Sequence, residues 1–443
     1  MSTARIDITP TVMTEMAGYG CVSTPRRATG TYSPLHATAV VLWDDGSPNV
    51  IISMDVEGIP AAWHQALRPR LVALASWASS DIVLIGTHTH NAPMAPDAPD
   101  PYILYNATDM TACNTHWAQL SDNIVALVTA ALAAPRVTVT LDYQFATQNW
   151  SFNRAGLSYT ETDVPVLTAR KPDGLPAVIF FSYGTHPVTA GQQTLWDGDF
   201  PSAAVAVIEA AIPGCVAAFL PGPAGDQDPV YPRSWAERNR HGASLGQAVV
   251  QKASAAGRAV TGPLMTSLSS VTAPLMLPTT PAEWATLRAS YVARLTNPPH
   301  GDAWAVRHAQ RMIAAIDAGS GWATSITLPT QVWKLSGSPT LRLGFVAGEL
   351  TSGYGVLFRN RFNGTNGLYI GGYANECVCY TVADTFFPPY DTNGSYEGGW
   401  DTDAPNAGGG SMGIYGFMGH FRYYPQAGAL EGLLVAALTT QLT

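Results

Sequence analysis

The sequence predicts a mixed α/β (α+β) fold in a single domain over residues 1–443. Three observations support this fold class. Short runs rich in Val, Ile and Leu, bounded by Gly, Pro or Asp, are typical of buried strands. Between them lie longer segments with the apolar spacing of amphipathic helices. No internal repeat or long linker divides the 443 residues, although this length could hold up to three average domains.

The predicted elements follow one another along the whole chain. Residues 37–43 and 49–55 form a hairpin across Asp44-Asp-Gly-Ser47. We expect two long functional loops, at 91–115 and in the Gly-rich stretch 397–414. The other predicted strands are 81–87, 136–147, 164–170, 176–182, 215–220, 263–276, 324–334 and 339–346. The predicted helices are 60–76, 116–134, 200–211, 234–256, 281–296, 302–318 and 425–441.

The composition argues against several classes of protein. The net charge is −9 and no run of Lys or Arg occurs, so a nucleic-acid partner is not expected. No apolar stretch reaches the roughly 18 residues of a transmembrane helix, and the first residues lack the apolar segment of a signal peptide. The cysteines are scattered and odd in number, namely Cys21, Cys113, Cys215, Cys377 and Cys379. We therefore expect a cytoplasmic, reducing location without stable membrane insertion.

A histidine pair follows the apolar run Ile82-Val-Leu-Ile85. This run predicts a buried strand, and side chains two residues apart on a strand share a face. We expect His88 and His90 to point the same way where the strand opens into a loop. Paired imidazoles at a strand end commonly bind zinc or pair with a nucleophile. The alternative is a pair of hydrogen-bonded histidines at a turn.

Three further segments supply candidate metal ligands. Thr185-His186-Pro187 repeats the first pattern, because an apolar strand leads into Gly-Thr-His, although a single histidine is often structural. Glu349 follows another apolar run, and it either presents a carboxylate to a site or caps the next helix. Tyr380 means little alone, because most tyrosines are packing residues. Cys377-Val-Cys379 is an alternative pair for a soft metal, but no second cysteine pair completes it.

The order of these motifs carries a family resemblance. The chain resembles the neutral/alkaline, non-lysosomal ceramidases, a family of zinc amidases, along nearly its whole length. Each motif is short, but their common order is specific. We do not expect the family's C-terminal immunoglobulin-like domain. The matching motifs are Asp7-Ile-Thr-Pro10, Met16-Ala-Gly-Tyr19, Gly86-Thr-His-Thr-His90, Asn153-Arg154, Thr185-His186-Pro187, Gly225-Asp-Gln-Asp-Pro229, Gly348-Glu349, Asn375-x4-Tyr380 and Tyr396-Glu397-Gly398.

The resemblance implies a role for each matching residue. His90 would lie beside the metal as a proton-transfer residue. Arg154 would hold a polar group of the substrate. Tyr396 would donate a hydrogen bond to the developing oxyanion. The implied ligands of the zinc ion, Zn2+, are His88, His186, Glu349 and Tyr380.

Asp228 is the main departure from the family pattern, in which serine usually stands at this position. A serine can donate a hydrogen bond to an oxyanion, whereas an ionised aspartate can only accept. We expect Asp228 to accept hydrogen bonds from an amine or hydroxyl of a small polar substrate, or to be protonated by its surroundings. The alternative is a carboxylate that holds the loop by binding backbone N–H groups. His90-Asn-Ala-Pro93 also differs from the family's usual His-Ser-Gly-Pro.

We therefore expect a zinc-dependent enzyme that hydrolyses the amide (C–N) bond of a small N-acyl or polar amide substrate in bacterial metabolism. Asp228 and the absence of an export signal favour such a substrate over ceramide. Three alternatives stay open. One is a true neutral ceramidase, which cleaves N-acylsphingosine to sphingosine and fatty acid. Another is an amidohydrolase-type (β/α)8 barrel in which His88 and His90 share one metal. The third is a non-catalytic binding protein with a closed structural zinc site.

Overall fold

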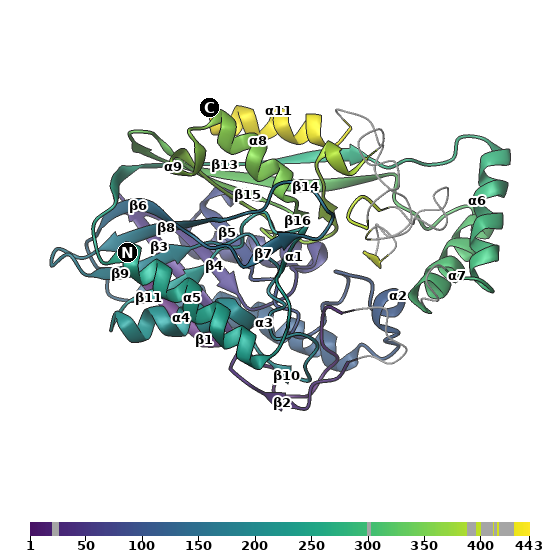
Figure 1. Cartoon of the computed structure of the whole chain (residues 1–443), viewed down its shortest axis with the longest axis horizontal. Helices are drawn as coiled ribbons and strands as arrows, with labels where there is room; N and C mark the ends of the chain where they lie inside the picture. The colour runs from purple at the N-terminus through teal and green to yellow at the C-terminus, as the bar shows by residue number, and fades with distance from the viewer. Residues whose placement is uncertain (20–25, 299–302, 388–395, 400–410, 412–413, 416–428) are drawn as a thin grey trace.

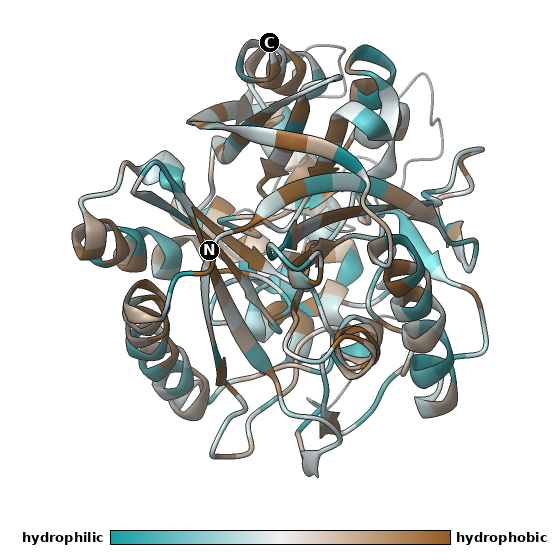
Figure 2. Cartoon of the chain, turned by 90° about the vertical axis from the view of Figure 1, so that its left-hand side faces the viewer, coloured by the Kyte–Doolittle hydropathy of each residue, from teal (hydrophilic) through white to brown (hydrophobic). Residues whose placement is uncertain are grey.

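The computed structural model describes residues 1–19, 26–298, 303–387, 396–399, 411, 414–415 and 429–443. Within these residues two β-sheets pack against each other, and helices cover their outer faces (Figure 1). In the end-on view, helices lie on the outside and strands cross the middle of the molecule (Figure 2). The mixed α/β fold class predicted from the sequence is confirmed. The open sheets show that the (β/α)8 barrel alternative is wrong.

The smaller sheet has the order β1-β3-β4-β5, and the larger one has the order β11-β9-β8-β6-β13-β14-β15-β17. The four strands of the smaller sheet are β1 (Ser2–Asp7), β3 (His36–Asp44), β4 (Ser47–Met54) and β5 (Ile82–Gly86). The eight strands of the larger sheet are β6 (Thr140–Thr147), β8 (Asp163–Arg170), β9 (Pro176–Phe181), β11 (Val216–Phe219), β13 (Arg258–Pro274), β14 (Ser325–Gly337), β15 (Leu341–Val346) and β17 (Leu368–Gly371).

Short strand pairs and helices complete the described part of the chain. The pairs are β2 (Gly30–Thr31) with β10 (Leu195–Trp196), β7 (Ser151–Asn153) with β12 (Gln227–Pro229), and β16 (Glu349–Leu350) with β18 (Tyr380–Thr381). The helices are α1 (Ala61–Ala75), α2 (Pro101–Tyr105), α3 (Thr111–Ala133), α4 (Asp199–Ala211), α5 (Trp235–Ala253), α6 (Pro281–Arg294), α7 (Ala303–Ala318), α8 (Ser352–Arg361), α9 (Gly364–Gly367) and α11 (Glu431–Leu442). Two 3-10 turns are η1 (Ser79–Asp81) and η3 (Asp384–Phe386).

Strand β5 shows why this chain forms a layered core. Its residues alternate between two hydrophobic clusters: Ile82 and Leu84 pack with residues of α1 and α3, whereas Val83 and Ile85 pack between the two sheets. A strand buried on both faces has a continuous apolar sequence, because neither face meets water. On the other side, α4 and α5 cover the larger sheet through a third cluster. The result is a helix–sheet–sheet–helix arrangement.

The remaining segments depart from the prediction in detail. Residues 91–115 are expected to form a loop, but α2 and the first turn of α3 lie within them. Asp100 explains the start of α2, because its carboxylate accepts hydrogen bonds from the backbone of Tyr102 and Ile103. Most of the predicted loop 397–414, and the first residues of the predicted helix 425–441, lie outside the described residues.

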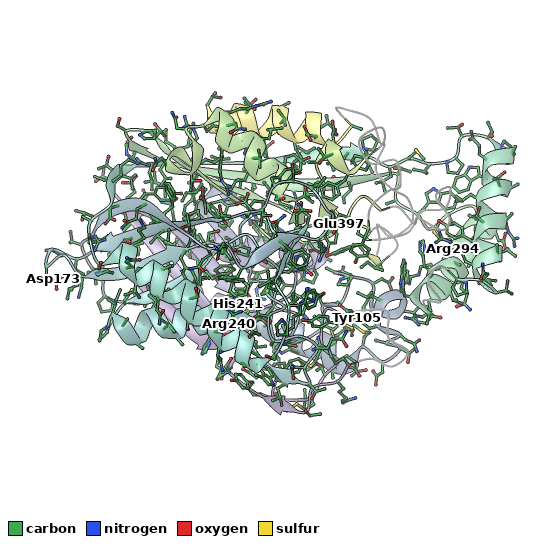
Figure 3. The ribbon with its side chains drawn as sticks, viewed as in Figure 1. Tyr105, Asp173, Arg240, His241, Arg294 and Glu397 are labelled. Atoms are coloured by element: carbon green, nitrogen blue, oxygen red, sulfur yellow. The ribbon has the colours of Figure 1, made fainter. Side chains whose placement is uncertain are left out.

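Helices α6 and α7 pack against each other at one end of the molecule. They lie on the right in Figure 1, and Arg294 on α6 marks the same end in Figure 3. Asp173, in the turn between β8 and β9, marks the opposite end. None of the described helices combines the length and apolar character that a bilayer crossing requires.

Candidate functional site

Three strand ends bring three of the four predicted ligands together. His88 lies just beyond β5 of the smaller sheet, whereas His186 follows β9 and Glu349 follows β15 of the larger sheet. The site is therefore built by both sheets. Burial is nearly complete, since His88, His186 and Glu349 are each at most 3% exposed. Glu349 faces the histidines, so the alternative in which it caps helix α8 is wrong.

The ring orientation of His88 and His186 is fixed by backbone carbonyl groups. His88 Nδ1 lies 2.5 Å from the carbonyl oxygen of Glu57, and His186 Nδ1 lies 2.8 Å from that of Ala224. A carbonyl oxygen can only accept a hydrogen bond, so the proton of each ring belongs on Nδ1. In the neutral rings, both Nε2 atoms therefore present a lone pair.

These lone pairs converge with the carboxylate of Glu349. Glu349 Oε2 lies 3.2 Å from His88 Nε2 and 3.1 Å from His186 Nε2. This oxygen has no hydrogen-bond donor of good geometry among the described residues. Three electron-rich atoms facing one another in a buried site repel unless a proton or a cation lies between them. Two imidazoles and a carboxylate are a donor set that suits zinc, so the residues present fit a metal ion.

The electrostatics of the cluster agree with this interpretation. Burial alone would raise the pKa of Glu349, but His88 and His186 hold it well below its usual value. Burial would lower the pKa of His88, but Glu349 and Glu57 raise it above the ordinary value for histidine. Burial and the charge of Arg154 lower the pKa of His186. These shifts show that a positive charge beside Glu349 is favoured.

His90 belongs to the same cluster, as the sequence predicts. Its Nε2 lies 3.4 Å from His88 Nε2, and the metal-binding atoms of His88, His90 and His186 all lie within 4.8 Å of one another. Burial, together with charge on His88 and His186, lowers the pKa of His90 well below its usual value. A side chain at Gly18 would collide with the His90 ring, since a Cβ atom would come within 2.2 Å of Cγ. Both a ligand role and a proton-transfer role fit this position.

Tyr380 lies beside Glu349 because β16 and β18 pair in parallel with these two residues in register. Its hydroxyl accepts a hydrogen bond of 2.8 Å from Arg154 Nη2. Its role as a fourth metal ligand stays a prediction. Tyr396 packs against it with a centroid separation of 5.7 Å and is 42% exposed. This exposure leaves the Tyr396 ring accessible from solvent, as a substrate-facing residue requires.

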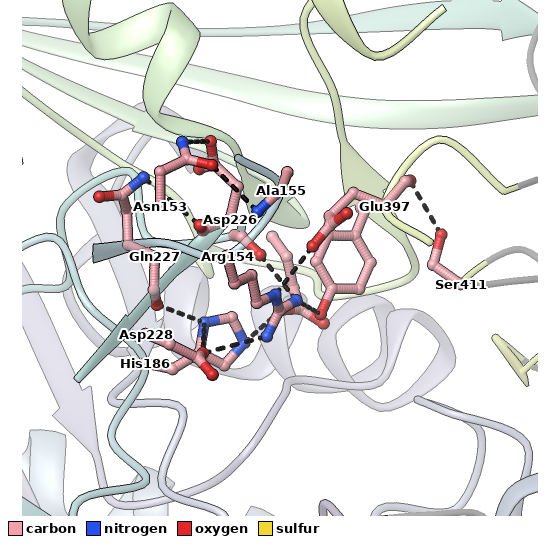
Figure 4. A network of polar contacts seen from close by, with 12 residues as sticks. Asn153, Arg154, Ala155, His186, Asp226, Gln227, Asp228, Glu397 and Ser411 are labelled. Atoms are coloured by element: carbon pink, nitrogen blue, oxygen red, sulfur yellow. Dashed lines mark hydrogen bonds and ion pairs between the residues drawn. The ribbon is translucent and has the colours of Figure 1, made fainter. Parts of the chain in front are cut away.

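Arg154 is held by the protein on every side of its guanidinium group (Figure 4). Nε donates to Glu397 at 2.8 Å, Nη1 to Asp228 at 3.2 Å, and Nη2 to the Gly225 carbonyl at 2.9 Å as well as to Tyr380. A guanidinium group has five N–H donors, so these bonds leave a single one for a substrate. In the substrate-binding role that the family resemblance implies, Arg154 can therefore donate only one hydrogen bond to a substrate.

Asp228 lies between two arginines rather than facing open space. One carboxylate oxygen accepts from Arg154, and the other accepts from Arg233. Burial would raise the pKa of Asp228, but Arg154, His186 and Arg233 lower it below its usual value, which argues against a protonated carboxyl group. The hydrogen-bond partners here are side chains, whereas the loop-holding alternative from the sequence expects backbone N–H groups.

Two groups near the cluster, the carboxyl group of Glu57 and the hydroxyl group of Tyr415, were not predicted from the sequence. The buried carboxylate of Glu57 accepts from the Tyr105 hydroxyl at 3.3 Å, and burial raises the pKa of Glu57 to about 7. Tyr415 donates to Glu349 Oε1. Glu57 could have been found, because it lies two residues beyond the predicted strand 49–55, much as Glu349 lies just beyond the predicted strand 339–346. No local pattern identifies Tyr415.

The fold is similar to that of solved ceramidases. A structure described as a ceramidase complexed with C2 matches with a TM-score of 0.69 and 16% sequence identity, covering 99% of this chain and 75% of that chain. The neutral ceramidase from Pseudomonas aeruginosa matches with a TM-score of 0.68 and 18% identity, over 99% of this chain and 74% of that chain. No family model and no curated protein matches the sequence. The resemblance noted in the sequence is thus confirmed by the structure: the chain has a neutral-ceramidase-like fold.

Proposed function

We propose that this protein is a metal-dependent hydrolase of an amide bond. The observation that carries the proposal is that His88 Nε2 and His186 Nε2 both lie within 3.2 Å of Glu349 Oε2, in a buried site of a ceramidase-like fold. Such a cluster of lone pairs has a clear use as a cation site and no evident use as a purely structural hydrogen-bond network. Ceramidases hydrolyse an amide, and this supports the same bond type here.

The metal ion we propose is zinc, held by His88, His186 and Glu349 with Tyr380 as the fourth ligand. When bound, zinc lowers the pKa of water and polarises a carbonyl group. The donor set has two nitrogens and no cysteine, and calcium or magnesium would require mainly oxygen ligands. The carbonyl groups of Glu57 and Ala224 orient the two rings, as partners of metal-binding histidines commonly do.

The side chains around the ligands would supply the rest of the chemistry. His90 is uncharged at neutral pH, because its pKa is lowered, so its ring can accept a proton and pass it to the leaving amine. Tyr396 donates a hydrogen bond to the oxygen that becomes negative in the transition state. Arg154 keeps the Tyr380 hydroxyl in place through a bond of 2.8 Å.

We propose a small N-acyl or polar amide as the substrate of a cytoplasmic enzyme. The charged groups Arg154, Asp228 and Arg233 beside the ligands support a polar substrate. The alternative is a true neutral ceramidase, and the fold similarity to such an enzyme favours it. The two substrates differ in the length of the apolar chains that the site must accept.

Purified protein tests the proposal directly. We expect about one zinc per chain by elemental analysis, together with hydrolysis of small N-acyl amides, and loss of both in H186A. Ceramide presented in detergent, assayed beside the small amides, separates the two substrate classes. A protein that carries zinc but cleaves neither class would instead be the non-catalytic binding protein with a structural zinc.

A further inference from the structure

Asp228 joins Arg154 to a second arginine, Arg233, outside the cluster of ligands. Asp228 Oδ1 lies 3.2 Å from Arg154 Nη1, and Oδ2 accepts from Arg233 Nη2. Each arginine therefore binds a different oxygen of one carboxylate. The side chains of Asp228 and Arg233 are only 12% and 17% exposed, so solvent screens this contact weakly.

The backbone around Asp228 already belongs to the site. Asp228 lies on β12, which pairs with β7, and β7 leads directly into Arg154. The neighbouring Gln227 carbonyl accepts the backbone N–H of His186 at 2.9 Å. Asp228 thus connects two segments that carry site residues, as the network in Figure 4 shows.

Arg233 is itself fixed from the outer side. Its guanidinium group lies over the ring of Tyr231, 4.6 Å from the centroid. Its Cβ packs closely on Gly191, where an added Cβ would come within 3.2 Å. Gly191 also has a φ of 73°, a conformation that favours glycine. Arg233 is therefore placed to hold Asp228 in contact with Arg154.

We propose that Arg233 is a positioning residue, which acts through Asp228 to hold Arg154 and thereby the Tyr380 hydroxyl. The proposal rests on the proposed hydrolase function of the same site. It differs from the expectation from the sequence that Asp228 itself receives the substrate, since each oxygen of its carboxylate already accepts a hydrogen bond from an arginine. Serine in this place offers one uncharged hydroxyl oxygen, so it could not give each guanidinium group a carboxylate oxygen of its own.

We call the contact of Arg233 with Asp228, and of Asp228 with Arg154, the brace. Kinetics of four variants test it. We expect R233A to lower kcat by up to about 100-fold, the cost that a misplacement of about 1 Å can have, with little change in KM and full metal content. D228N weakens the same link and should have a similar effect. In the double variant the two losses should not add, because both act through one contact. R233K should recover part of the lost kcat, because its ammonium group can still pair with Asp228.

R240A is the matched control. Arg240 lies on α5, pairs with Glu237 and has a 58% exposed side chain (Figure 3). Its removal deletes one arginine of the same region without touching the brace, so we expect unchanged kcat and KM. Full additivity of R233A and D228N, or a rise in KM alone, would overturn the positioning role.

A measurement without substrate separates this inference from the proposed function. Arginine side-chain NMR spectra of nitrogen-labelled protein, assigned with R154K, report whether the guanidinium of Arg154 is held. We expect slow rotation of its Nη groups in the wild type and in R233K, and faster rotation in R233A. Fast rotation in the wild type would contradict the brace. If the wild type hydrolyses no amide but its Arg154 is held, the proposed function fails while the brace stands.

Discussion

His88 has a backbone φ of 69°, a conformation that residues other than glycine adopt only at some cost. Tyr373 and Asn375, which lie close by, have φ values of 61° and 63°. The His88 ring packs on Tyr373 with 4.3 Å between centroids and is held by the Glu57 carbonyl. Backbone strain concentrated in this way is typical of sites whose side-chain directions matter. Here it turns the His88 ring toward His186.

The two histidines of the first motif should differ in their effect on metal binding. H88A removes a ligand, so we expect zinc to be lost along with activity. H90A should keep zinc and lower kcat by about 10²- to 10⁴-fold, the usual cost of a lost proton-transfer group. Zinc content by elemental analysis and steady-state kinetics measure both effects. Zinc loss in both variants would make His90 a third nitrogen ligand, which the 4.8 Å cluster also permits.

Tyr396 supplies a test of oxyanion stabilisation. Y396F removes one hydroxyl group from a ring that is 42% exposed, so little stability depends on it. We expect kcat to fall by about 10²- to 10³-fold, as for other single oxyanion donors, while KM changes little. Tyr32, 41% exposed and stacked on Trp235, is a matched control. If Y396F has the kinetics of Y32F, Tyr396 does not act on the transition state.

At the scale of elements, short strands position most of the site. β7 and β12 are each three residues long, and β16 and β18 are each two residues long. Asp226 ties these pairs together: its carboxylate accepts from Asn153 Nδ2 at 2.7 Å and from the backbone N–H of Ser352 at 2.7 Å. It is fully buried. This aspartate therefore links β7, β12 and the first turn of α8.

Loss of the Asp226 carboxylate should destabilise the protein. D226A leaves buried donors of Asn153 and Ser352 unpaired, at a cost of at least about 2 kcal/mol in the free energy of unfolding. The midpoint of urea unfolding, followed by tryptophan fluorescence, measures this change. D173A alters an aspartate in an exposed turn, with a side chain that is 56% exposed, and should stay within about 0.5 kcal/mol of the wild type. Equal midpoints for the two variants would contradict the linking role.

The same elements show how far sequence reasoning reaches. The strand predicted at 81–87 is observed as β5, Ile82–Gly86, because a run of apolar residues buried on both faces is a strong local signal. β16 and β18 were not predicted, because two-residue strands have no periodicity. The convergence of His88, His186 and Glu349 was implied by the family resemblance. The contact of Arg233 with Asp228 was not predicted, since no local sequence pattern marks an arginine that holds a second arginine through a shared carboxylate.

At the scale of the whole molecule, the candidate site lies where the two sheets meet. His88 comes from the smaller sheet, whereas His186 and Glu349 come from the larger one. The hydrophobic layer between the sheets contains Ile85 of β5 and Phe345 of β15, close in sequence to these ligands. A metal ion bound here would connect the two halves of the core. Binding of the ion should therefore stabilise the fold as a whole.

Removal of the metal should consequently lower the thermal stability of the wild type. A ligand that binds only the folded state adds about 4 kcal/mol when its free concentration is 1,000-fold above Kd. We expect the Tm to fall by several degrees after dialysis against a chelator and to recover when zinc is added. H186A is the control: it lacks one ligand, so its Tm should respond to neither treatment. A zinc-dependent Tm that persists in H186A would place the stabilising ion at another site, whereas a wild-type Tm that ignores both treatments would mean that the cluster of His88, His186 and Glu349 binds no metal.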